Sequence, residues 1–136
     1  MTEFIDTNVF IRLLARDDPT KTERCLALFQ RAEAGDVRLV TSETNVAEVV
    51  YVLASRVLYH LPRAEVARLL RPLVKLRALT IDHKESVLRA IDRYGSSNLD
   101  FEDCLAVAHM QRRGLTSIYS YDRGFDRVEG IQRLEP

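Results

Sequence analysis

Apolar residues along the chain form two kinds of pattern, short continuous runs and stripes with helical spacing. The short runs predict strands, because a strand buried in a parallel sheet is apolar on both faces. The stripes predict amphipathic helices, whose apolar side chains recur every three or four residues. Strands are expected at 4–5, 37–40, within 76–81, at 117–120 and at 131–134. Helices are expected at about 9–14, 18–35, 43–59, from 62 onward, at 82–95 and at 101–113.

Residues with capping or helix-breaking properties stand at several of these boundaries. Asp18 is expected to be an N-cap with Pro19 as the first helical residue, and Gly35 is expected to end that helix. Pro72 should end or kink the fourth helix. Strands that alternate with helices through short turns predict a three-layer α/β/α fold with a mostly parallel, about five-stranded sheet. The chain is expected to form one domain, residues 1–136.

Four acidic residues occupy positions that solubility alone does not explain. Asp6 follows the first predicted strand and Asp122 follows the fourth. Right-handed crossovers would place both at the carboxyl edge of one sheet, where ligand sites form. Asp103 begins the last long helix, whose start reaches the same edge. Glu48 lies mid-helix between valines, where burial of an unpaired carboxylate is costly.

Each of these acids also has an ordinary structural interpretation. Asp6 is a suitable N-cap, and Asp122 is a suitable turn residue before Arg123-Gly124. Asp103 stands three residues after Asp100, a spacing that resembles a capping box. For Glu48 the ordinary alternative is an ion pair with a nearby arginine.

Taken together, the four acids predict a metal site. Two carboxylates about 5 Å apart repel each other by roughly 3 kcal/mol at an effective dielectric constant near 20. A divalent cation relieves this repulsion, and Mg²⁺ or Mn²⁺ prefers oxygen ligands. His60, His83 and His109 show no regular spacing with the acids, which makes a zinc site a poor fit.

Four segments, 4–8, 47–48, 103–108 and 120–125, resemble in order and spacing the motifs of the PIN-domain ribonucleases. The compact length resembles the VapC-type toxins of toxin–antitoxin pairs. The resemblance implies a ribonuclease that hydrolyses RNA phosphodiester bonds with Mg²⁺ or Mn²⁺. It implies the following catalytic and metal-binding residues: Asp6, Glu48, Asp103 and Asp122, with Asp126 as an additional metal ligand. It also implies supporting polar groups: Thr7, Asn8, Ser120 and Asp100.

Partners follow partly from the residues and partly from the resemblance. Arginines near the predicted cleft are candidates for contacts with RNA phosphates: Arg112, Arg113, Arg123 and Arg127. The resemblance implies a homodimer and a small antitoxin protein. The apolar run from Val49 to Leu61 and the leucines of the fourth helix are candidate partner surfaces, although such stripes more often pack in the core.

Composition limits the other classes of function. The 20 basic and 20 acidic side chains balance, so a strongly basic surface is not predicted from the total charge. No apolar run approaches the roughly 20 residues of a membrane span, and a cytoplasmic location is expected. Cys25 and Cys104 form no Cys-x-x-Cys pair and are expected to be reduced core residues.

Three other classes of function share the predicted fold. A phosphatase that forms an aspartyl-phosphate also begins with a strand and an aspartate, but Asn8 stands where its general acid is expected. A receiver-like signalling domain requires an acid pair after the first strand and a lysine after the fifth, and neither is evident. A catalytically silent RNA-binding or protein-binding module on the same fold is the main alternative.

Overall fold

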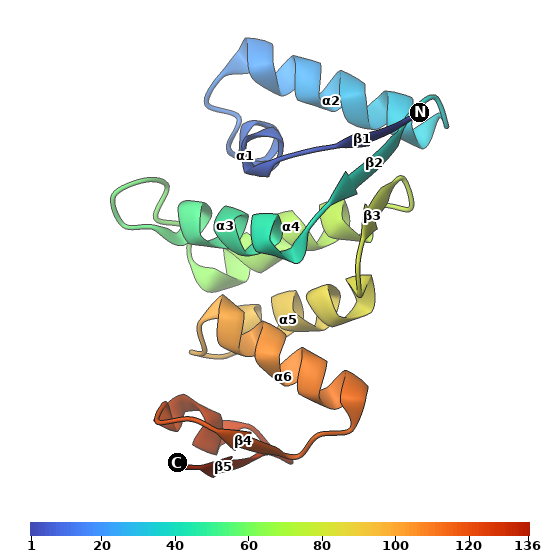
Figure 1. The fold of residues 1–136 in the computed structure, drawn as a ribbon. Coiled ribbons are helices and arrows are strands. Elements are labelled where there is room, and N and C mark those ends of the chain that lie inside the picture. Colours follow the sequence, from blue (N-terminus) through green and yellow to red (C-terminus); the bar gives the residue numbers. More distant parts are fainter.

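The structure is a computed structural model that describes residues 1–136, and short strands alternate in it with helices (Figure 1). The first half of the chain contains β1 (Thr2–Phe4), α1 (Thr7–Ala15), α2 (Pro19–Glu33), β2 (Arg38–Thr41), α3 (Glu43–Ala54) and α4 (Arg63–Lys75). The second half contains β3 (Leu79–Ile81), α5 (Lys84–Ser96), α6 (Phe101–Arg113), β4 (Ser117–Tyr119), a short 3₁₀ helix η1 (Arg123–Arg127) and β5 (Gln132–Leu134). Six helices and parallel strands are consistent with the predicted three-layer α/β/α fold.

All strand pairs are parallel, but the five strands do not form one sheet. β1, β2 and β3 pair in that order, with Phe4 opposite Val40 and Val40 opposite Thr80. β4 pairs only with β5, with Ser117 opposite Gln132. The expectation of a single five-stranded sheet is therefore corrected to a three-stranded and a two-stranded sheet.

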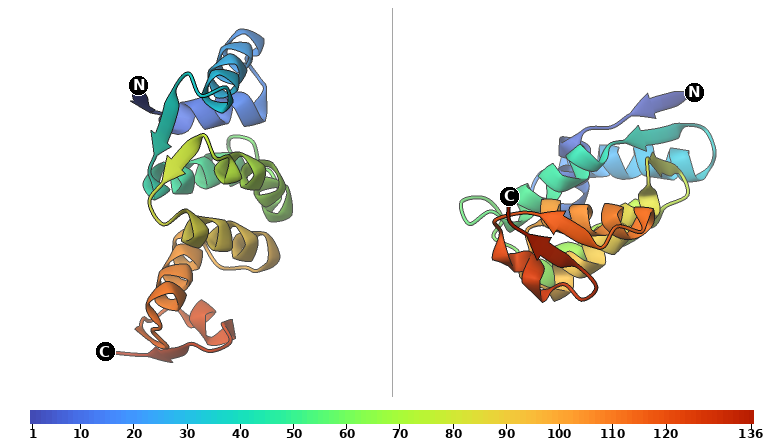
Figure 2. Two further views of the ribbon diagram at one scale, coloured as in Figure 1. Left: turned by 90° about the vertical axis from the view of Figure 1, so that its right-hand side faces the viewer. Right: turned by 60° about the horizontal axis from the view of Figure 1, so that its bottom comes forward.

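The two sheets lie at opposite ends of the molecule, as do the two chain termini (Figures 1 and 2). Helices α5 and α6 follow β3 and carry the chain away from β1 before β4 begins (Figure 1). Each of these strands contains only three or four residues, so each forms few ladder hydrogen bonds. Asp6 and Asp122 consequently follow strands of different sheets, and the expectation that both stand on one sheet edge is wrong.

The predicted apolar stripes form the core. Phe10, Leu39, Val46 and Leu70 are fully buried and belong to one cluster of apolar side chains. Close packing between α4 and α5 depends on Gly95, where an added Cβ would lie 2.8 Å from the Cβ of Ala67. The helices therefore pack through the faces that the hydrophobic pattern predicts.

Most predicted boundaries are confirmed, and one helix is shorter than expected. Asp18 caps α2 by accepting a hydrogen bond from the Lys21 amide at 3.1 Å, and Pro19 is the first residue of this helix. α3 was expected to continue to about Tyr59 but ends at Ala54. The chain turns there because Ser55 is extended and its carbonyl accepts the His60 amide at 2.9 Å.

Pro72 neither ends α4 nor starts a new element, since this helix continues to Lys75. The proline removes one backbone donor, and the buried leucines and valines of α4 compensate by packing in the core. No helix in the structure is both long enough and apolar enough to cross a membrane.

Candidate active site

Asp103 and Asp122 come together although nineteen positions separate them in the sequence. Asp103 lies in the first turn of α6, and Asp122 is the N-cap of η1. Burial and the nearby charges of Asp122 and Asp100 raise the pKa of the Asp103 carboxyl. All three charged groups that act on Asp103, namely Asp122, Asp100 and Glu102, raise its pKa, so no cation offsets the negative charge there. The pair is therefore an uncompensated acidic centre.

The Asp122 carboxylate is held by local hydrogen bonds. Its Oδ1 accepts the Gly124 amide at 2.8 Å, which caps η1. The Asp122 amide donates to the Ser120 hydroxyl oxygen at 3.0 Å. Ser120 thus fixes the backbone that presents Asp122, as a supporting residue would.

Glu48 occupies a different setting from the one that the sequence suggests. Its neighbours Val46, Val49 and Val50 are buried, but Glu48 itself is exposed on the solvent side of α3. The buried Thr7 hydroxyl donates to Glu48 Oε2 at 2.8 Å. The expectation that the Glu48 carboxylate is buried is wrong. The valines on either side of Glu48 lie on the face of α3 that packs in the core, and the helical turn places Glu48 on the opposite, solvent-exposed face.

Asn45, which the sequence did not single out, connects this region to the sheet. Its side-chain amide donates to the Ile5 carbonyl at 3.3 Å and to the Thr41 hydroxyl at 3.2 Å. The Thr7 hydroxyl lies 3.4 Å from Asn45 Oδ1. Asn45 stands about one helical turn before Glu48 on α3. This three-residue spacing is the only feature of the sequence that could have indicated that Asn45 lies beside Glu48.

Asp6 is exposed and caps α1, where its Oδ1 accepts the Asn8 amide at 3.1 Å. Asp6 directly precedes Thr7, so it belongs to the same end of the structure as Glu48. These contacts link the carboxylates in two sets, Asp6 with Glu48 through Thr7 and Asp103 with Asp122 directly. No group of three or more Asp, Glu, His or Cys side chains gathers in a geometry that could hold a metal ion.

A groove of about 620 Å³ between α3 and α6 extends from Glu48 to Glu102, the residue next to Asp103. Glu43 and Glu48 line it from α3, while Glu102 and His109 line it from α6. Glu102 directly precedes Asp103. His109 Nε2 lies 3.1 Å from Glu43 Oε2 and joins the two helices, a contact that no sequence spacing indicates.

The remaining predicted residues have clear positions. Asp126 forms an ion pair with Arg133 at 2.9 Å, so its charge is already neutralised, which disfavours a role as a metal ligand. Asp100 is the N-cap position of α6, but its side chain forms no capping hydrogen bond.

Two of the four predicted RNA-binding arginines stand near the acids and two do not. Arg123 and Arg127 are the first and last residues of η1, directly after Asp122. Arg112 and Arg113 lie in the last turn of α6, about 15 Å along the helix from Asp103 at 1.5 Å per residue. At that end they complement the helix dipole, and their contact with RNA phosphates stays a prediction.

The family model of the PIN domain matches residues 4–131. The chain belongs to the PIN-domain family. Three curated relatives match it over nearly their whole lengths. VapC ribonuclease Mb1869c of Mycobacterium bovis and ribonuclease VapC13 of Mycobacterium tuberculosis are each 28% identical over 96% of this chain and 97% of the relative. A VapC ribonuclease of Aquifex aeolicus is 22% identical over 98% of this chain and 96% of the relative.

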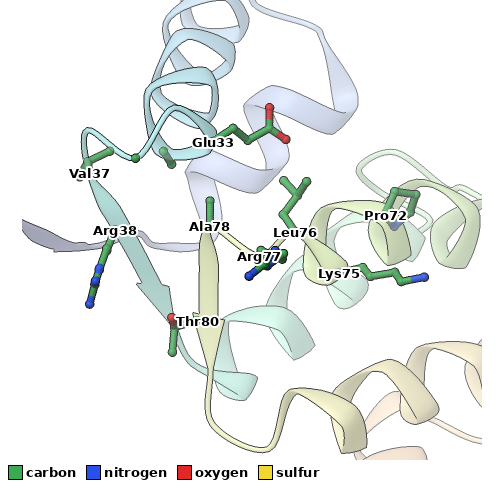
Figure 3. A pocket seen from close by; sticks show the side chains of 11 residues that line it. Glu33, Val37, Arg38, Pro72, Lys75, Leu76, Arg77, Ala78 and Thr80 are labelled. Carbon is green, nitrogen blue, oxygen red and sulfur yellow. The ribbon is translucent and has the colours of Figure 1, made fainter.

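A cavity of about 990 Å³ in this PIN domain is lined by residues from the end of α2, β2, the end of α4 and β3 (Figure 3). Arg38 at the start of β2 and Arg77 just before β3 line it. It therefore opens at the amino ends of these strands, whereas Asp6 follows the carboxyl end of β1. None of the predicted catalytic residues borders this cavity.

Proposed function

We propose that this PIN domain is a metal-dependent endoribonuclease and the toxin component of a type II toxin–antitoxin system. The observation that carries the proposal is the uncompensated pair of Asp103 and Asp122. The full-length similarity to proteins named VapC ribonucleases supports the activity and the substrate class.

The residues of the acidic centre suit a hard divalent cation. The carboxylates of Asp103 and Asp122 offer oxygen ligands only, and the raised pKa of Asp103 reports negative charge that a cation would neutralise. We propose Asp103 and Asp122 as the primary ligands of Mg²⁺ or Mn²⁺, with Asp6 and Glu48 as the second carboxylate set. When bound, such an ion polarises the scissile phosphate and lowers the pKa of an attacking water molecule.

The chain's own groups prepare these carboxylates. Thr7 orients Glu48, and the Gly124 amide orients Asp122, each through one hydrogen bond of 2.8 Å. Asp103 is fixed by its place in the first turn of α6. No side-chain nucleophile is required, because water attacks the phosphorus.

Cleavage of a mixed RNA pool tests this proposal. The purified protein is incubated with Mg²⁺ or Mn²⁺ and, separately, with excess chelator, beside Asp103→Asn and Asp122→Asn. We expect cleavage that requires the metal and falls at least a hundredfold in both variants, since each loses a metal-binding charge while keeping its shape.

Asp36→Asn is the matched control, because Asp36 is an exposed aspartate whose side chain forms no hydrogen bond or ion pair. It should retain wild-type activity. Cleavage that persists in chelator, or in both active-site variants, would exclude the metal mechanism and this assignment of the acids.

A catalytically silent RNA-binding module is the second candidate. The absence of a cluster of three or more potential metal-binding side chains favours it. The same experiment separates the two functions, since such a module binds the RNA pool but leaves it uncut with either metal.

We further propose a homodimer and a small antitoxin protein as partners. Tyr51, Val57 and Leu58, within the predicted partner surface, are 70%, 89% and 56% exposed. Exposed apolar side chains that lie close together favour a protein interface.

A further inference from the structure

A cavity of about 500 Å³ outside the acidic centre is lined mainly by polar and basic side chains. Arg89 and Arg93 reach it from α5, Gln111 from α6 and Arg127 from the end of η1. Three elements thus place three guanidinium groups and a carboxamide around one hollow. Ser96 and Ser97 complete its polar wall.

The positive charge of this cavity is not neutralised within the chain. Its one acidic side chain, Asp92, is bound by Arg71, with Arg71 Nε 2.7 Å from Asp92 Oδ1. The side chains of Arg89, Arg93 and Arg127 form no hydrogen bond or ion pair, whereas the side chain of Arg71 has a carboxylate partner. The hollow therefore has an excess of positive charge.

Two of these arginines stand four residues apart on α5 and border the same hollow. Like charges at this spacing repel each other and destabilise a helix. An anion between Arg89 and Arg93 would remove the repulsion. Guanidinium groups suit phosphate in particular, because their planar fork donates two parallel hydrogen bonds to its oxygens.

We propose that this cavity binds backbone phosphates of single-stranded RNA and positions the substrate of the proposed nuclease. Arg127 ends the 3₁₀ helix that Asp122 caps. Five residues at about 2 Å per residue separate the two ends of η1 by about 10 Å. A strand held at Arg127 therefore passes close to the acidic centre. This inference rests on the proposed function for its choice of RNA as the ligand.

Binding of a labelled 2′-O-methyl RNA decamer tests the inference. The probe cannot be cleaved through its 2′ oxygens, and chelator in the buffer prevents metal-dependent hydrolysis. The dissociation constant is measured at several salt concentrations for wild type, the double variant Arg89→Gln/Arg93→Gln, and Arg127→Gln. Each phosphate contact with a single strand contributes about 0.7 to the slope of log affinity against log salt. We expect the slope to become shallower by about 1.4 in the double variant and by about 0.7 in Arg127→Gln.

The double variant Arg24→Gln/Arg31→Gln is the matched control. It removes two arginines from one helix, α2, and both are exposed and border none of the described cavities. Circular dichroism establishes that all variants are folded. A slope that equals that of wild type in both cavity variants, or a change no larger than in the control, would overturn the inference.

The two proposals fail in different ways. Wild-type cleavage of the RNA pool together with an unchanged salt slope would remove the phosphate site and leave the nuclease intact. Binding that depends on Arg89 and Arg93, without any cleavage by wild type, would support the site and exclude the nuclease.

Discussion

The hydrogen bond from Thr7 to Glu48 allows a test of how the second carboxylate set contributes to activity. Thr7→Val removes the hydroxyl and keeps the β-branched shape at a position that is 8% exposed. The lost bond is 2.8 Å long and ends on a carboxylate. Hydrogen bonds to charged groups contribute roughly 1.5–3 kcal/mol to stability.

The loss of stability should lie below that range. Glu48 is exposed, so its carboxylate regains hydrogen bonds from water once the threonine hydroxyl is gone. We expect the free energy of unfolding to fall by about 1 kcal/mol, which lowers Tm by about 3–5 °C in a domain of this size.

Thr7→Val should also lower the rate of RNA cleavage. Without the hydroxyl, Glu48 samples several rotamers, and we expect RNA cleavage to slow by about tenfold, equivalent to roughly 1.4 kcal/mol in the barrier. The assay compares initial rates at a fixed metal concentration and a temperature well below both Tm values. This readout separates a positioning role for Thr7 from a purely structural one.

Thr22→Val provides the control, because the Thr22 hydroxyl forms an equally short bond, 2.7 Å, to the Arg12 carbonyl. That bond joins α2 to α1 and does not involve a candidate acid. It should lower stability by a similar amount and leave cleavage unchanged. Wild-type cleavage by Thr7→Val, or an equal loss of rate in Thr22→Val, would refute the role of Thr7 in placing Glu48.

Two further predictions concern stability. Burial and the charge of Asp122 raise the pKa of Asp103, so ionising Asp103 costs stability as pH rises through its titration range, and that cost persists above it. Asp122→Asn keeps the capping oxygen but removes the charge. In chelator, this variant should have a higher free energy of unfolding than wild type at neutral pH, and the difference should vanish at acidic pH. Urea titrations of both proteins at both pH values measure the sign of this difference. Gly95→Ala should destabilise by about 1–3 kcal/mol because its Cβ would lie 2.8 Å from the Ala67 Cβ. Restoration of the melting temperature by added Ala67→Gly would support this cause, whereas a fully stable single variant would contradict it.

Local features were predictable because they depend on neighbouring residues. The Asp18–Pro19 start of α2 follows from the N-cap hydrogen bond and the fixed φ of proline. Most elements, and the parallel direction of the strands, follow from the alternation of apolar runs and stripes. The end of α3 at Ala54 was missed because the apolar pattern continues beyond it, and only the tertiary turn after Ser55 ends the helix.

The sequence by itself determined the fold class, and its motif order predicts the residue types of the acidic centre and the supporting hydroxyl of Ser120. Motif order along a chain identifies such residues, because each motif is a local segment. The tertiary structure alone decided which residues meet: Asp103 with Asp122, Thr7 with Glu48, and Arg89 and Arg93 with Arg127. Pairing between distant segments depends on how strands and helices pack. Because β1–β3 and β4–β5 form separate sheets, Asp6 and Asp122 follow strands of different sheets, although their local sequences suggest a shared edge.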